Sequence, residues 1–102
     1  MIQYLDKCGR QISESKWNQL ITDKFYRVVA QQYVGDHFVS TIWLGVPSGP
    51  FGIYIFETVI FAPNEKNWRT DRAIETIRYE TLEEAVNGHS EAIKRSYEEV
   101  CA

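Results

Sequence analysis

The run FGIYIFETVIFA at residues 51–62 restricts the fold of this chain more than any other stretch. Most of its side chains are β-branched or aromatic, and such residues favour an extended, pleated backbone. Successive side chains of a strand point to opposite faces, so this strand is apolar on both faces and is expected to be covered on both. Glu57 lies in the middle of the run and needs a partner there if its carboxylate is ionised.

Size and composition predict a single globular domain over residues 1–102. The chain is 44% hydrophobic and 25% charged, which excludes a disordered polypeptide. Its net charge is −3, with 11 Lys and Arg against 14 Asp and Glu, which argues against a surface for DNA or for an anionic membrane. No segment reaches the roughly 20 consecutive apolar residues of a membrane span. The polar start MIQYLDKCGR lacks the hydrophobic region of a signal peptide, so we expect a protein of the cytoplasm.

The cysteines and histidines do not indicate a disulfide framework or a metal centre. Cys8 and Cys101 lie near opposite ends of the chain, so we expect two free thiols in a reducing compartment. The two histidines are far apart, and no spacing resembles that of a zinc site. We therefore predict neither a metal ion nor another cofactor.

Caps and turn signals predict most of the remaining elements. Ser13 is a favourable N-cap for a short helix over residues 14–21. Residues 35–36, Gly-Asp, are a hairpin signal between two strand-like runs, with Val34 expected to pair with His37. Strands are predicted over residues 24–34, 37–46 and 72–79.

The clearest element is an amphipathic helix over residues 82–100. Thr81 and Glu84 form a capping box at its start. Gly88 interrupts the helix at a cost of roughly 1 kcal/mol relative to Ala, which indicates a close approach to the sheet. The fold class that follows is α+β: an antiparallel β-meander of about four strands, with the C-terminal α-helix packed on one face and a short N-terminal helix.

The uncovered face of this sheet predicts self-association. One amphipathic helix covers only one face, whereas the strand at residues 51–62 is apolar on both. The second face is therefore expected to meet another subunit, with sheet buried against sheet. We predict a homo-oligomer that is at least a dimer.

Glu57, Thr41 and His89 are predicted to form a buried polar contact. If Val46 pairs with Gly52, Thr41 lies opposite Glu57 and its hydroxyl donates to the carboxylate. His89 lies on the apolar stripe of the C-terminal helix and is expected to point inward as well. A buried Glu–His pair is either a structural ion pair that fixes the helix on the sheet or a proton-transfer unit. We prefer the structural role, because no nucleophile or metal accompanies the pair.

Arginine and aromatic residues in the last third of the chain form the candidate ligand site. The set consists of Arg69, Arg78 and Arg95 with Trp68 and Tyr97. Guanidinium groups bind phosphate, and aromatic rings stack on nucleobases. The alternative is a group of solvated charges near a sheet edge, with Trp68 folded back onto that edge. An oligomer would bring two such sets together at a subunit interface.

Several segments together resemble a group of short proteins encoded by tailed bacteriophages and prophages. They are VSTIWLG at residues 39–45, FETVIF at 56–61, RYET at 78–81 and GH at 88–89. The resemblance covers nearly the whole chain. Many members of that group continue after the VSTIWLG segment with an acidic residue and a His, whereas this chain continues with Val46 and Pro47. The group supplies no catalytic residues to transfer.

The resemblance implies a setting for the function, and three hypotheses follow. The first is a non-enzymatic bacteriophage counter-defence protein that binds and sequesters a small cyclic-nucleotide signal at a subunit interface in the host cytoplasm. The second is an anti-CRISPR-type inhibitor that blocks a host defence protein by direct binding, for which the net charge of −3 is small. The third is a small hydrolase that uses Glu57 and His89.

Overall fold

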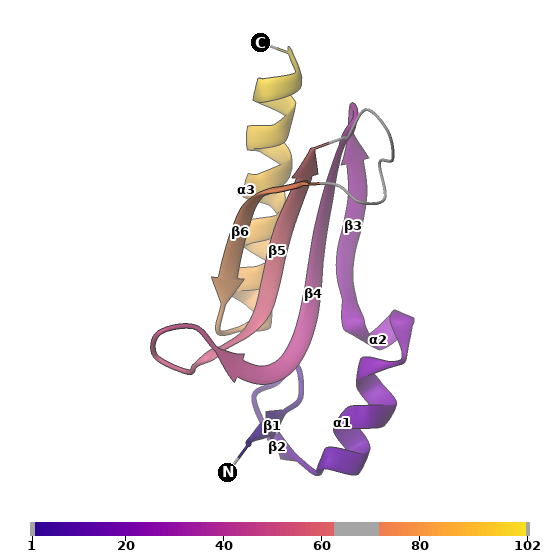
Figure 1. Cartoon of the computed structure of the whole chain (residues 1–102), viewed down its shortest axis with the longest axis vertical. Helices are drawn as coiled ribbons and strands as arrows, with labels where there is room; N and C mark the ends of the chain where they lie inside the picture. Colours follow the sequence, from indigo (N-terminus) through magenta and orange to yellow (C-terminus); the bar gives the residue numbers. More distant parts are fainter. Residues whose placement is uncertain (1, 63–71, 102) are drawn as a thin grey trace.

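The computed structural model describes residues 2–62 and 72–101, and these residues form an α+β fold, as predicted (Figure 1). The elements are β1 (Tyr4–Leu5), β2 (Gln11–Ile12), α1 (Glu14–Ile21), α2 (Lys24–Arg27), β3 (Val28–Val34), β4 (His37–Ser48), β5 (Tyr54–Ala62), β6 (Arg72–Tyr79) and α3 (Leu82–Cys101). β3, β4, β5 and β6 form an antiparallel meander in that order, and β1 pairs with β2. α3 packs on one face of the meander, with its axis roughly parallel to the strands (Figure 1).

Both predicted helix starts are confirmed by their caps. The Ser13 side chain accepts a hydrogen bond from the Lys16 N–H at 3.1 Å, which satisfies one of the free donors in the first turn of α1. At the start of α3, the Thr81 N–H donates to Glu84 Oε1 and the Glu84 N–H donates to Thr81 Oγ1. This reciprocal capping box explains why α3 begins where the sequence predicts.

The strand predicted over residues 24–34 is wrong for residues 24–27, which form a helix. The Asp23 side chain accepts a hydrogen bond from the Phe25 N–H at 3.0 Å and caps the short helix α2. This local capping outweighs the strand preference of Phe25 and Tyr26. β3 therefore begins at Val28, and it contains a β-bulge between Val28 and Ala30 that the expected pairing did not include.

The strand predicted over residues 51–62 is shorter in the structure. β5 begins at Tyr54, and β4 continues as far as Ser48. Gly49 and Gly52 adopt positive φ angles of 84° and 62° in the turn between them. These backbone conformations are favourable for glycine and belong to a turn. Phe51, which the prediction placed in the strand, lies in this turn and is 76% exposed.

The hydrophobic core lies between α3 and one face of the meander. Trp43 and Phe56 are fully buried against Ala85, while Val39 and Ile60 are buried against Ala92. Trp17 of α1 closes one end of this core, where its Nε1–H donates to the Leu44 carbonyl at 2.9 Å. A Cβ atom added at Gly88 would overlap the ring of Tyr79 in β6, which confirms the predicted close approach of α3 to the sheet.

The opposite face of the meander, which we call the open face, carries a different set of side chains. The strand register places Phe38, Ile42, Glu57, Val59, Phe61, Thr76 and Arg78 on it. Along β4 and β5 these residues alternate with side chains that are buried beneath α3. The open face is thus a mixed apolar and charged surface on the side of the sheet away from α3.

Candidate functional site

Three buried polar side chains meet between α3 and the centre of the sheet. Thr41 of β4 and Thr58 of β5 are opposed in register, and their hydroxyl oxygens lie 2.5 Å apart. Nδ1 of His89 lies 2.7 Å from the Thr41 hydroxyl. Thr41, Thr58 and His89 are all buried. We call these three residues the polar cluster.

A consistent order of hydrogen-bond donors runs through the polar cluster. Burial lowers the pKa of His89, which favours a neutral imidazole with one donor and one acceptor nitrogen. Nε2 of His89 lies 3.3 Å from the side-chain oxygen of Gln32, which only accepts, so Nε2 carries the hydrogen. Nδ1 then accepts from the Thr41 hydroxyl, which in turn accepts from Thr58. Because Thr41 is 0% exposed, its hydroxyl serves the packing of α3 on the sheet and does not face a substrate.

The predicted contact of Glu57 with Thr41 and His89 is wrong. Thr41 pairs with Thr58, and Glu57 pairs with Ile42, so the true register differs by one residue from the expected one. A shift of one residue moves a side chain to the other face of a sheet. Glu57 therefore lies on the open face, where its carboxylate is 3.6 Å from Nε of Arg78. Neither a Glu57–His89 ion pair nor a proton-transfer unit of these two residues exists in this fold.

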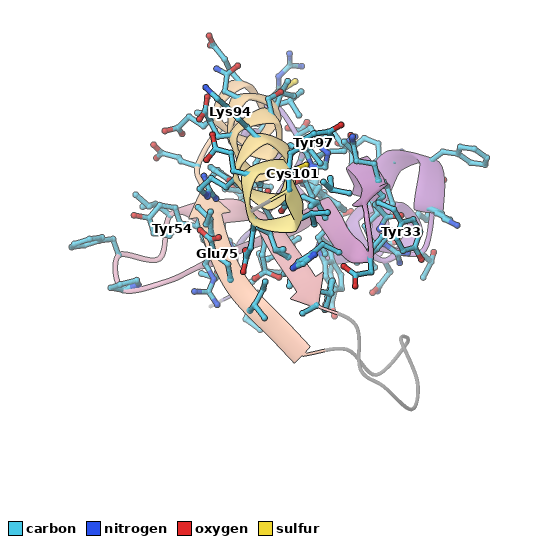
Figure 2. The ribbon with its side chains drawn as sticks, turned by 90° about the horizontal axis from the view of Figure 1, so that it is seen from above. Tyr33, Tyr54, Glu75, Lys94, Tyr97 and Cys101 are labelled. Atoms are coloured by element: carbon cyan, nitrogen blue, oxygen red, sulfur yellow. The ribbon has the colours of Figure 1, made fainter. Side chains whose placement is uncertain are left out.

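The predicted ligand set is divided between the two faces of the molecule. Arg78 lies on the open face beside Glu57, whereas Arg95 and Tyr97 lie on α3. Arg95 donates to Glu75 at 3.0 Å, and Tyr97 is 62% exposed on the flank of α3 that is turned toward β3 (Figure 2). Within one copy of the chain, Arg78 therefore does not converge with the other two. Trp68 and Arg69 lie outside the described residues.

A row of aromatic side chains crosses one end of the open face. Tyr33 of β3, Phe38 of β4 and Phe61 of β5 are opposed in register. The ring centroids of Tyr33 and Phe38 lie 4.8 Å apart, and those of Phe38 and Phe61 lie 6.2 Å apart. We call these residues the aromatic row. The confirmed pairing of Val34 with His37 implies the Tyr33–Phe38 contact, but the place of Phe61 depends on the β4–β5 register.

A shallow hollow lies between the β1–β2 hairpin and the turn that follows β4. Its volume is about 230 Å³, and its lining includes Leu5, Pro47, Ile53 and Glu80. Glu80 is the charged residue in this lining, so the hollow is poorly suited to a phosphate. The open face is the better candidate surface for an anionic ligand.

Three further observations concern the described residues alone. Among them, no group of three or more His, Cys, Asp or Glu side chains is arranged to hold a metal ion. No described helix combines the length and the apolar character that crossing a membrane requires. Cys8 and Cys101 are both free and exposed thiols.

Comparison with protein-family models, with curated proteins and with solved structures found no match to this chain.

Proposed function

We propose that this chain is a non-enzymatic counter-defence protein of a tailed bacteriophage. In this proposal it binds and sequesters a small nucleotide-derived signal in the host cytoplasm, at a boundary between two copies of the chain. The setting is supported by the resemblance of its VSTIWLG, FETVIF and RYET segments to small phage proteins. The ligand class is supported by the open face.

The observation that carries the ligand class is the presence of aromatic rings and a guanidinium on one surface. The aromatic row places three rings on this face, and aromatic rings are the groups on which nucleobases stack. Arg78 lies on the same face, and its Nε is 3.6 Å from Glu57, which is longer than a hydrogen bond. The N–H groups of Arg78 are therefore not saturated by that carboxylate, and they suit the oxygens of a phosphate.

The spacing on the open face favours a ligand with more than one nucleotide unit. Phe61 and Glu57 both lie on β5, four residues apart, and Arg78 pairs with Glu57 in register. At about 3.3 Å per residue, the aromatic row lies roughly 13 Å from the level of Arg78. A cyclic dinucleotide or trinucleotide spans this separation more readily than a mononucleotide does.

Thermal denaturation in the presence of a panel of cyclic dinucleotides and trinucleotides tests this proposal. A ligand at 100 times its Kd adds about 2.7 kcal/mol of stability, which raises the Tm of a domain of this size by about 10–20 °C. Arg78→Gln should reduce the shift, while Arg95→Gln is the matched control because Arg95 lies on α3. The absence of a shift with every member of the panel would refute the nucleotide ligand.

The fate of the bound ligand separates sequestration from catalysis. A sequestering protein should release the nucleotide intact when the protein is heat-denatured. Recovery of a hydrolysed or rearranged nucleotide would instead show that the chain is an enzyme. The measurement is chromatography of the supernatant after denaturation, with the unbound nucleotide carried through the same heating as the reference.

A second candidate, an inhibitor that blocks a host nuclease complex, is favoured by one feature of α3. Glu84, Glu91 and Glu98 are exposed and spaced by seven residues, so they lie along one side of the helix. A row of carboxylates can imitate a nucleic-acid backbone, although Lys94 and Arg95 lie near it in the sequence. Binding to an RNA-guided nuclease complex that Glu91→Gln and Glu98→Gln weaken, and that DNA competes away, would support this candidate over nucleotide sequestration.

A further inference from the structure

We infer that a second copy of this chain binds to the open face, with Glu57 of each copy facing Arg78 of the other. This inference places the subunit boundary on which the proposed function rests. Its test measures association alone and needs no ligand, so its failure is distinguishable from failure to bind a nucleotide.

The composition of the open face is the first step. An antiparallel sheet that keeps one face in water usually presents polar side chains on that face. Here Val59 and Phe61 of β5 stand on the open face and remain partly exposed. A surface of this composition favours burial against another apolar surface.

The charges on the open face identify the occupant. Among the residues that the structure describes on this face, Glu57 and Arg78 are the one acid and the one base, side by side on neighbouring strands, so they contribute no net charge. The side chain of Arg78 is 46% exposed, and that of Glu57 is 19% exposed. A surface that carries one charge of each sign is complementary to a copy of itself when it is turned over.

The strand register shows how such a copy would be placed. A two-fold axis that runs along the strands between β5 and β6 stacks β5 of each copy on β6 of the other. Glu57 then faces Arg78, and Val59 faces Thr76, because these pairs are already opposed in register within one copy. The interface is isologous, since every contact between the two copies occurs twice, once on each side of the axis.

This placement also leaves room for the proposed ligand. β3 and β4 lie beyond the edge of the partner's β6, so Tyr33 and Phe38 form the floor of a ledge at the boundary of the two copies. Two such ledges are related by the axis. The proposed nucleotide would stack on this floor beside the partner.

Sedimentation-velocity analysis of four proteins at low ionic strength tests the inference. The wild-type chain should be a dimer at tens of micromolar protein. Arg78→Glu places two acids on the open face, and Glu57→Arg places two bases there. Each variant alone should dimerise about 30-fold more weakly or worse, whereas an equimolar mixture of the two should recover a dimer, because acids then face bases.

The ion pair on the other side of the molecule supplies the control. Arg95→Glu and Glu75→Arg reverse a pair of the same type, with a separation of 3.0 Å, that joins α3 to β6. These two variants should remain as dimeric as the wild type. A monomeric wild type, or reversal variants that dimerise unchanged, would overturn the inference.

The mixing step distinguishes pairing between copies from pairing within one copy. If both reversal variants are folded monomers and their mixture stays monomeric, Glu57 does not face Arg78 across the boundary and the inference fails. Circular dichroism establishes folding before each run. If a reversal variant does not fold, Arg78→Gln and Glu57→Gln serve instead, and an unchanged dimer Kd for both would equally overturn the inference.

Discussion

Thr41 and His89 are 48 positions apart in the chain, yet the Thr41 hydroxyl lies 2.7 Å from Nδ1 of His89 in the buried layer beneath α3. A polar contact in such a layer is stabilising only when every partner is satisfied. Here Thr58 and Gln32 complete the set at its two ends. The polar cluster therefore fixes where α3 lies along the sheet more specifically than apolar packing does.

The position of Thr41 between Thr58 and His89 predicts unequal effects of two isosteric substitutions. Thr41→Val leaves both Nδ1 of His89 and the Thr58 hydroxyl unpaired in the core, which should cost about 2–5 kcal/mol. Thr58→Val removes one donor and leaves the Thr41–His89 bond intact, so about 1 kcal/mol is expected. Urea denaturation measures both, and a loss for Thr58→Val as large as that for Thr41→Val would contradict the central position of Thr41 between Thr58 and His89.

His89 predicts a loss of stability in mild acid. Burial lowers its pKa in the folded state, so the unfolded chain binds the proton more readily. Stability from neutral His89 is fully present above the ordinary histidine pKa of about 6.5. It decreases as the pH falls below that value toward the folded-state pKa.

The matching variant is His89→Gln, which cannot titrate. Its stability is expected to be lower than that of the wild type at about pH 8 and to decline less between about pH 7 and pH 5. Urea midpoints across this range provide the comparison. Parallel pH profiles for the two proteins would show that His89 does not contribute to the acid sensitivity.

Gly45 predicts a severe packing defect on substitution. Its φ angle is 74°, and an added Cβ would overlap Trp43 and lie 2.7 Å from ring atoms of Trp17. Gly45→Ala should therefore cost about 1–2 kcal/mol for the backbone and about 1–3 kcal/mol more for overpacking. Gly9→Ala is the control, because Gly9 has a φ of 81° and open space around it. Equal Tm losses for the two variants would refute the packing term.

Whether a substitution at Gly88 stabilises or destabilises the protein is expected to depend on its neighbour Tyr79. Alanine favours the helix by about 1 kcal/mol over glycine, but its Cβ would overlap the ring of Tyr79. Gly88→Ala is expected to destabilise the wild type by about 1–2 kcal/mol net. In a Tyr79→Ala background the same change should stabilise the protein. A double-mutant cycle measured by urea denaturation tests this, and equal effects of Gly88→Ala in the two backgrounds would refute the overlap with Tyr79.

The elements that sequence predicts best are those whose ends are determined locally. Ser13 caps α1 through a residue three positions away, and the capping box of Thr81 and Glu84 has the same short range. The turn after Val34 has a two-residue signal of its own. Each of these features depends on a few consecutive residues and needs no knowledge of the rest of the fold.

The candidate site was harder to predict, because it depends on a register that no local signal determines. The pairing of Ser48 with Tyr54 beside the turn does not continue to Thr41, because the register shifts between Trp43 and Ser48, where Gly45 has a positive φ, before Thr58 lies opposite Thr41. The same register assembles the aromatic row from three strands. The helical period alone predicts that the His89 side chain points inward, but it does not predict that the Thr41 hydroxyl is its partner.

The contacts of α3 have a consequence for how the molecule opens. α3 contacts all four strands of the meander. β3 and β6 are the two edge strands of the meander and do not pair with each other. Local unfolding of α3 would therefore release both edges together. Amide hydrogen exchange in β3 and in β6 should then report the same opening event, although these strands share no hydrogen bond.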